Sequence, residues 1–289
     1  MRNRQSCLLW SFILLANSVT APASVAKVGP PNGYLLLVGG GMRDPGILGH
    51  FMKLAGGSEA PIVVIPTAGG QDYYDEYWPG LEPFREAGAR NLIVLHTVDR
   101  SVADTEEFVR PILGARGVFF TGGRQWRLAD SYLNTRTHRE LQALLDRGGI
   151  IGGTSAGATI MGSFLVRGDT KGNTTMVGDH VEGFGFLQGV AIDQHMLKRN
   201  RHFDMIEVIR ERPELLGIGL DENAAILVSQ DVFTVMGQSY VAIYDVQRSI
   251  PPDGKFYFLA PGDVYNLETR EAFRPGVTPL QRIKEAKWK

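Results

Sequence analysis

Short runs of apolar residues alternate with helical patterns over the first half of the chain, and this alternation restricts the fold. Each run is apolar throughout, instead of alternating with polar residues, which is typical of strands covered on both faces. Regular strand–helix alternation predicts an α/β fold, a mostly parallel sheet sandwiched by helices. The expected strands are 34–38, 62–65, 92–95, 118–120 and 150–151, and the expected helices are 44–55, 74–87, 104–114 and, in two pieces, 125–147.

The pattern changes after residue 173, where short strand-like segments dominate and one helix is expected near 198–211. We interpret these segments as a continuation of the same sheet with antiparallel additions, so that residues 27–289 form a single α/β domain. Earlier in the chain, Asp104 followed by Glu107 resembles a capping box and predicts the start of the third helix. The later strands are expected at 175–178, 189–193, 225–229, 232–236, 240–245 and 256–259.

Residues 1–26 have the three-part arrangement of a secretory signal peptide. Basic residues at positions 2 and 4 precede an apolar run over 8–16, which is too short to span a bilayer. Small residues follow, and cleavage is expected at Ala21, Ala23 or Ala26. We therefore expect the working protein to be exported, to the periplasm or to the medium, and to have no membrane attachment after cleavage.

Charge and cysteine content exclude several classes of function. The chain has 30 Lys and Arg against 31 Asp and Glu, so its formal net charge of -1 gives no long-range attraction to nucleic acid or anionic membranes. Its single cysteine, Cys7, lies in the expected signal peptide, which excludes a disulfide framework, a cysteine zinc site and a thiol nucleophile from the mature protein. The histidines show neither H-x-x-x-H nor H-E-x-x-H spacing, which disfavours a zinc site. The serine chemistry argued below requires neither a metal nor an organic cofactor, so none is expected.

Gly39-Gly40-Gly41 follows an expected strand and precedes an expected helix, where a phosphate-binding loop would lie. The dinucleotide pattern G-x-G-x-x-G requires a glycine at position 44, but Asp44 stands there, and no G-x-x-x-x-G-K-[ST] motif is present. We therefore interpret the three glycines as a tight turn or a place where the backbone approaches a neighbour closely.

Gly153-Thr154-Ser155-Ala156-Gly157 matches G-x-S-x-G, with an apolar strand before it and an expected helix over 156–164 after it. A serine on a sharp strand-to-helix turn occupies a strained backbone conformation, and its neighbours two residues away must be small to avoid collision. The alternative is a small-residue turn whose serine only caps a helix. The strand and helix on either side favour Ser155 as a nucleophile.

A serine nucleophile needs a base, and the base needs an orienting acid. His195 follows a strand-like segment, and the carboxyl ends of strands are where open α/β sheets carry their chemistry. His180, in a polar loop, is the competing candidate. Either Asp221 or Glu222 could orient the histidine, and spacing alone leaves both choices open. The order serine, histidine, acid differs from that of α/β-hydrolases, in which the acid precedes the histidine.

Four segments together resemble the S51 serine peptidases, the group of the cyanophycinases and dipeptidase E. The segments are Thr121-Gly122-Gly123-Arg124-Gln125, the G-x-S-x-G turn, Asp193-Gln194-His195 followed by Arg199 and Arg201, and Gly217-Ile218-Gly219-Leu220-Asp221-Glu222. The resemblance extends from about Gly39 to the C-terminus and implies a fold like that of the class I glutamine amidotransferases. It also implies a catalytic triad of Ser155, His195 and Glu222, and a substrate pocket lined by Gln125, Asp193, Gln194, Arg199 and Arg201.

The Asp-Gln-His segment with Arg-x-Arg is more specific to the cyanophycinase branch than to the dipeptidases. Cyanophycinases release β-aspartyl-arginine dipeptides from cyanophycin, a poly-aspartate backbone that carries arginine on each side chain. The resemblance therefore implies acyl transfer, in which His195 takes the proton of Ser155 and the serine oxygen attacks the carbonyl of a β-aspartyl bond. The backbone N–H groups of Gly123 and Ala156 are our candidates for the oxyanion hole.

Three positions differ from the family pattern. Arg124 stands where aspartate or asparagine is frequent, Met196 where phenylalanine is common, and Asp204 where some members carry arginine. Two other functions therefore stay open: an exopeptidase for aspartyl or isoaspartyl dipeptides, and an exported binding protein that keeps the fold without catalysis. The expected partner is cyanophycin or a β-aspartyl peptide, and a homodimer is common in similar proteins.

Arg199 and Arg201 are expected at the start of the helix near 198–211. There they could clamp a substrate carboxylate through paired hydrogen bonds. The alternative is a basic helix face that is only solvated.

Overall fold

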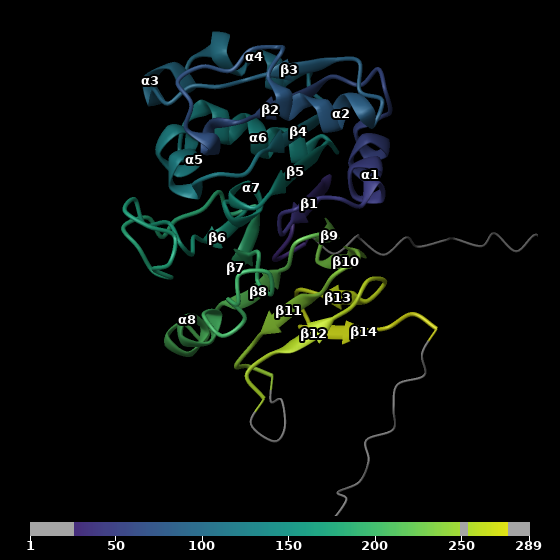
Figure 1. The fold of residues 1–289 in the computed structure, drawn as a ribbon, viewed down its shortest axis with the longest axis vertical. Helices are drawn as coiled ribbons and strands as arrows, with labels where there is room; N and C mark the ends of the chain where they lie inside the picture. Colours follow the sequence, from purple (N-terminus) through teal and green to yellow (C-terminus); the bar gives the residue numbers. More distant parts are fainter. Residues whose placement is uncertain (1–25, 249–253, 277–289) are drawn as a thin grey trace, which may run out of the picture.

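The computed structural model describes residues 26–248 and 254–276, and these residues form two sheets with helices packed around them (Figure 1). The larger sheet has nine strands in the order β14-β13-β10-β9-β1-β5-β4-β2-β3. Its strands β1, β5, β4, β2 and β3 run parallel, as the strand–helix alternation predicts, and its other half is antiparallel. The nine strands are β1 (Tyr34–Val38), β2 (Ile62–Ile65), β3 (Leu92–Val94), β4 (Gly117–Phe120), β5 (Ile150–Thr154), β9 (Ala224–Ser229), β10 (Val232–Gly237), β13 (Val264–Asn266) and β14 (Glu271–Phe273).

The wholly apolar runs form strands because both faces of the parallel half are covered. Along β1, Leu36 and Val38 pack with α1 and α2, whereas Leu35 and Leu37 face the opposite side, toward α4, α5 and α6. This alternation follows from the two-residue period of side chains along a strand. The helices of this region are α1 (Pro45–Ala55), α2 (Glu82–Glu86), α3 (Arg100–Ala103), α4 (Glu106–Gly114), α5 (Gln125–Tyr132), α6 (Arg136–Asp146) and α7 (Ala156–Thr159), with 3₁₀ turns η1 (Thr67–Gly69) and η2 (Pro79–Leu81).

A second, five-stranded sheet has the order β12-β11-β8-β7-β6. The expectation that the later strands continue the first sheet is therefore wrong for β7, β11 and β12 and correct for the antiparallel strands β9 and β10. Strands β6, β7 and β8 are parallel, and α8 packs on them through a core that includes Met196, Met205 and Tyr244. The elements are β6 (Gly162–Phe164), β7 (Leu187–Gln194), β8 (Leu216–Leu220), β11 (Val241–Tyr244), β12 (Tyr257–Leu259) and α8 (Met205–Glu211).

Several local predictions are corrected by the structure. The helix expected over 104–114 is α4, which begins at Glu106, and the short helix α3 that precedes it was not predicted. Thr105, not Asp104, caps α4 by accepting a hydrogen bond from the backbone N–H of Phe108. The helix expected over 156–164 ends at Thr159, because Gly162–Phe164 pairs with β7 as a strand. The helix expected over 74–87 is reduced to η2 and α2, and residues 175–178 form turns and bends instead of a strand.

The expected signal peptide lies outside the described residues, apart from Ala26, and so does Cys7. Within the part of the chain that the structure describes, no helix is long and apolar enough to cross a membrane.

Candidate active site

Ser155 lies at the sharp turn between β5 and α7, with backbone angles φ 54 and ψ -116. A serine with positive φ is strained, and such conformations persist where surrounding contacts hold them. The backbone N–H of Ser155 donates to Val38 O at 2.9 Å, and its carbonyl accepts from Thr159 N at 3.0 Å. A Cβ on Gly153 would lie 2.3 Å from Gly157 O, so this turn requires the small residues predicted beside the serine.

The side chains of Ser155, His195 and Glu222 form a continuous hydrogen-bonded chain. Ser155 Oγ lies 2.9 Å from His195 Nε2, and His195 Nδ1 lies 2.8 Å from Glu222 Oε1. The three residues follow the carboxyl ends of β5, β7 and β8, so the chain connects the larger sheet to the smaller one. This arrangement has the geometry of a nucleophile, a base and an orienting acid.

The structure distinguishes between the candidates that spacing leaves open. Asp221 binds the backbone N–H groups of Leu197 and Lys198, both at 2.9 Å, and therefore does not orient the imidazole. His180 lies between two other carboxylates, with Nε2 2.8 Å from Asp130 Oδ1 and Nδ1 3.0 Å from Asp179 Oδ1. Of the two histidines and two acids, only His195 and Glu222 are in line with Ser155.

Burial lowers the pKa of His195 below its usual value of 6.5, which favours the neutral imidazole that a general base requires. The hydrogen bond with Glu222 acts in the opposite direction and raises this pKa. The positive charges of Arg199 and Arg201 lower it further, because both guanidinium groups lie close enough to destabilise the imidazolium.

We expect kcat/KM to fall on the acid side with an apparent pKa below 6.5, because activity is lost as His195 becomes protonated. Arg199→Gln removes a charge that opposes protonation, so the acid limb should move to higher pH by a fraction of a pH unit. Arg210→Gln on the exposed face of α8 is the control and should leave the limb in place. An acid limb above 6.5, or one that Arg199→Gln does not move, contradicts this assignment.

The glycine loop that follows β1 belongs to this site, which the sequence motifs did not indicate. Gly40 has φ 122, and a Cβ there would lie 2.2 Å from His195 Cε1, while a Cβ on Gly41 would lie 2.7 Å from Glu222 Oε2. The carbonyl of Gly39 also accepts the N–H of His195 at 3.0 Å. The close approach predicted for these glycines is therefore an approach to the His195–Glu222 pair.

The two candidate oxyanion donors lie on either side of the serine. Ala156 is the first residue of α7, and Gly123, with φ 144, follows Gly122, whose added Cβ would lie 3.4 Å from Ser155 Cβ. Among the described residues, neither the N–H of Gly123 nor that of Ala156 has a hydrogen-bond acceptor. Both groups are therefore available to a negatively charged oxygen next to Ser155.

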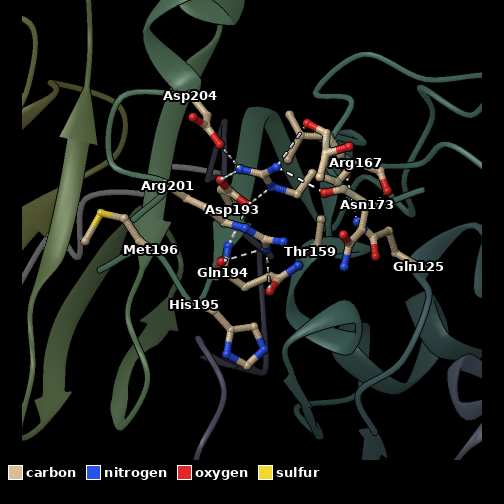
Figure 2. Close-up of polar contacts among 12 residues, drawn as sticks. Gln125, Thr159, Arg167, Asn173, Asp193, Gln194, His195, Met196, Arg201 and Asp204 are labelled. Carbon is tan, nitrogen blue, oxygen red and sulfur yellow. Dashed lines mark hydrogen bonds and ion pairs between the residues drawn. The ribbon is translucent and has the colours of Figure 1, made fainter. Parts of the chain in front are cut away.

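Figure 2 shows four of the five expected substrate residues, Gln125, Asp193, Gln194 and Arg201, in the same region as His195. Two of them, Gln125 and Asp193, already bind other parts of the protein. Gln125 is buried, and its amide nitrogen donates to Val166 O and Arg167 O, both at 2.9 Å. Asp193 receives hydrogen bonds from Arg167 on both carboxylate oxygens, at 2.7 and 2.9 Å. Sequence reasoning did not identify Arg167, and its position outside the motifs offered no signal.

The other three expected substrate residues, unlike Gln125 and Asp193, do not bind Arg167 or its backbone. They are Gln194, Arg199 and Arg201. Arg201 is buried beside Gln194, with Nη1 3.3 Å from both the backbone and side-chain oxygens of that residue, whereas Arg199 is exposed. The expectation that both arginines begin a helix is wrong, because α8 starts only at Met205 and both residues lie in the turns before it.

The three positions that differ from the family pattern each have a structural explanation. Arg124 donates to the carbonyls of Asp169 and Gly172 and so holds the loop after β6. Met196 is buried, with its sulfur 3.6 Å from the hydroxyl of Tyr244. Asp204 accepts a hydrogen bond from Arg167 at 2.6 Å.

Comparisons with known proteins identify the family of this chain. The profile described as Peptidase family S51 matches residues 35–236. A protein named cyanophycinase from Geminocystis herdmanii is 32% identical over 261 residues, covering 82% of this chain and 94% of the relative. A second, from Thermosynechococcus vestitus, is 30% identical over 275 residues, covering 86% and 83%.

Two solved structures are also similar to this chain. A peptidase from an acI-B1 actinobacterium has a TM-score of 0.62 and 25% identity, covering 81% of this chain and 97% of that one. A putative peptidase E from Listeria monocytogenes has a TM-score of 0.52 and 16% identity, covering 72% and 99%, and so shows the fold alone.

Proposed function

The chain belongs to peptidase family S51 and is a serine-type hydrolase, and from this premise we propose that it releases β-Asp-Arg dipeptides from cyanophycin. The relatives named cyanophycinase support the substrate. The main support for the chemistry is the alignment of Ser155 Oγ, the His195 imidazole and Glu222 Oε1 at 2.9 and 2.8 Å. Membership of this hydrolase family argues against a binding protein without catalysis.

In the proposed mechanism, His195 Nε2 accepts the proton of Ser155 as its oxygen attacks the backbone carbonyl that joins two aspartates. The β-aspartyl bond, which the resemblance led us to expect as the target, is not the one cleaved, because its hydrolysis would release free arginine instead of β-Asp-Arg. Glu222 accepts the Nδ1–H of His195, which holds the imidazole in the required tautomer and stabilises its protonated form. The N–H groups of Gly123 and Ala156 stabilise the oxyanion. His195 then protonates the leaving amine, and water, deprotonated by His195, hydrolyses the acyl-enzyme.

The direct test is to incubate the purified protein with insoluble cyanophycin and to identify the soluble products by mass spectrometry. We expect β-Asp-Arg, together with labelling of Ser155 by a fluorophosphonate reagent, located by peptide mass. Hydrolysis of short aspartyl or isoaspartyl dipeptides alone would instead assign the protein to the dipeptidases. Labelling at another residue would contradict the proposed nucleophile.

We also propose that the protein is exported and that cleavage after Ala26 makes Lys27 the first residue. Support comes from Asp231, whose carboxylate receives the backbone N–H groups of Lys27 at 2.9 and 3.1 Å, Val28 at 2.8 Å and Gly29 at 3.0 Å. After such cleavage the nitrogen of Lys27 would be an ammonium group, which pairs more strongly with a carboxylate. The mass of the exported protein tests the cleavage site, and retention of Met1 would contradict it.

Asp231→Asn is expected to lower the free energy of unfolding by about 1–3 kcal/mol, because it weakens the bonds to three backbone groups. Burial raises the pKa of Asp231, but the hydrogen bonds from the backbone N–H groups outweigh this and lower the pKa below 3.8. The ionised carboxylate therefore stabilises the fold above about pH 4, and this contribution is lost as the pH falls through the lowered pKa. Urea titrations should show the difference between wild type and Asp231→Asn decreasing over that range, and a constant difference would contradict this role.

A further inference from the structure

Arg167 lies inside the candidate substrate pocket, in a loop that follows β6, with a positive φ of 54. Its side chain is 1% exposed. Its Nε and Nη2 bind the two oxygens of Asp193 at 2.7 and 2.9 Å, and Nη2 also lies 2.6 Å from Asp204 Oδ2. Nη1 donates to the carbonyl of Asn173 at 3.1 Å, and Figure 2 shows this guanidinium enclosed between Asp193, Asp204 and the loop.

An incoming arginine side chain would need a carboxylate, since paired bonds to carboxylate are how proteins bind guanidinium strongly. Asp193 has both oxygens occupied by Arg167. Glu222 is bound to His195 and lies 3.6 Å from Arg43, and Asp221 is bound to backbone N–H groups and to the hydroxyl of Ser239. The carboxylates next to His195 are therefore already used by the protein itself.

Asp204 keeps one oxygen free of hydrogen bonds to the described residues, and its side chain is 38% exposed. This residue faces a separate hollow that it shares with Phe203 and Glu207 and whose lining includes none of the three triad residues. The guanidinium of the substrate could therefore bind in this hollow instead of beside His195, and the variant Glu207→Gln tests that alternative.

The two arginines near His195, unlike the carboxylates, have no ion-pair partner among the described residues. Among the described residues, no carboxylate lies within ion-pair distance of Arg199 or Arg201. Arg201 is only 7% exposed, and among the described residues its guanidinium makes only the two long hydrogen bonds to Gln194. Asp193 and Asp204 are near enough for their negative charges to act on Arg201, but neither pairs with it directly. A buried cation without a direct ion pair is costly, and an anion that binds beside it removes part of that cost.

The proposed substrate offers such anions. Each arginine of cyanophycin is attached through its α-amino group, so its α-carboxylate is free, and the last unit also ends in a backbone carboxylate. These groups lie near the scissile amide, whereas the guanidinium lies at the end of a flexible side chain. On the basis of the proposed function, we infer that this enzyme recognises the carboxylates of the terminal unit and not its guanidinium, because its own Arg167 occupies Asp193.

The inference is tested with three synthetic aspartate oligomers that differ in the β-linked residue: arginine, citrulline, and arginine whose α-carboxylate is an amide. Citrulline keeps the shape of arginine but is neutral. We expect citrulline to change wild-type kcat/KM by less than about 3-fold, and the amide to lower it by about 100-fold or more. A loss with citrulline as large as the loss with the amide would overturn the inference.

Two variants add independent outcomes. Arg167→Met frees Asp193, so it should raise the ratio of kcat/KM for arginine over citrulline, whereas Arg139→Met on the exposed side of α6 should not. Glu207→Gln should affect the arginine and citrulline oligomers equally, and a selective loss with arginine would move recognition to the outer hollow and overturn the inference. If Arg167→Met does not fold, the wild-type series and Glu207→Gln still decide.

Failure of the proposed function has a different signature. If wild-type protein does not hydrolyse the arginine oligomer at all, the proposed function itself is wrong. If it hydrolyses this oligomer but rejects citrulline, only the inference is wrong.

Discussion

Ser155→Ala is expected to lower kcat/KM for cyanophycin by on the order of 10⁴-fold or more, because a peptidase without its nucleophile keeps only the contribution of binding and oxyanion stabilisation. The side chain of Ser155 forms its hydrogen bond with His195 and none with the framework of the turn. The fold should therefore survive the change, and the measurement is the rate of dipeptide release by mass spectrometry.

Ser229→Ala, at the exposed end of β9, is the matched control and should keep wild-type activity. Both variants should unfold at the wild-type temperature, so that a loss of activity in one of them reports on chemistry alone. Retention of more than a trace of hydrolysis by Ser155→Ala would exclude this residue as the nucleophile.

Gly40→Ala is also expected to lower kcat/KM strongly, although residue 40 touches neither the nucleophile nor the scissile bond in the proposed mechanism. The added Cβ would lie 2.2 Å from His195 Cε1, and alanine is also strained at φ 122. The imidazole must move away from Ser155, and a displacement of about 1 Å in such a pair costs about 100-fold in rate. We expect kcat/KM and the rate of Ser155 labelling by a fluorophosphonate to fall together.

Gly49→Ala provides the matched control, because no atom lies within 4 Å of the added Cβ and alanine favours the α1 helix. It should leave both rates unchanged and should not destabilise the protein. Wild-type activity in Gly40→Ala would show that His195 is not held by this loop and would remove the loop from the active site.

The parallel half of the larger sheet was predictable from sequence because its signal is local. A strand such as β1 is apolar at every position, since helices cover both faces, and a nearby glycine or proline often marks its end. The second sheet was not predictable in this way. Strand β8 is apolar and buried throughout, as the parallel strands of the first sheet are, and only its pairing with β7 and β11 assigns it to a different sheet.

The candidate site, too, has one part that local sequence predicts and another that depends on tertiary contacts. The G-x-S-x-G turn is specified by a local steric requirement, because a Cβ on Gly153 would lie 2.3 Å from Gly157 O. The choice between Asp221 and Glu222, which are adjacent in sequence, depends on which side chain points toward His195. Spacing contains no information on that direction, and the resemblance to S51 peptidases supplied the choice that the hydrogen bonds now support.

The sequence alone indicated the family, through the four segments that resemble S51 peptidases. It also determined the α/β architecture and the serine turn, because both are encoded by short-range patterns of apolar and small residues. The tertiary structure alone decided what the polar side chains bind. It paired Arg167 with Asp193, placed Gly40 against His195 and, among the described residues, left Arg201 without a carboxylate within ion-pair distance. These contacts join segments far apart in the chain, and they arise only when two sheets bring the ends of their strands together.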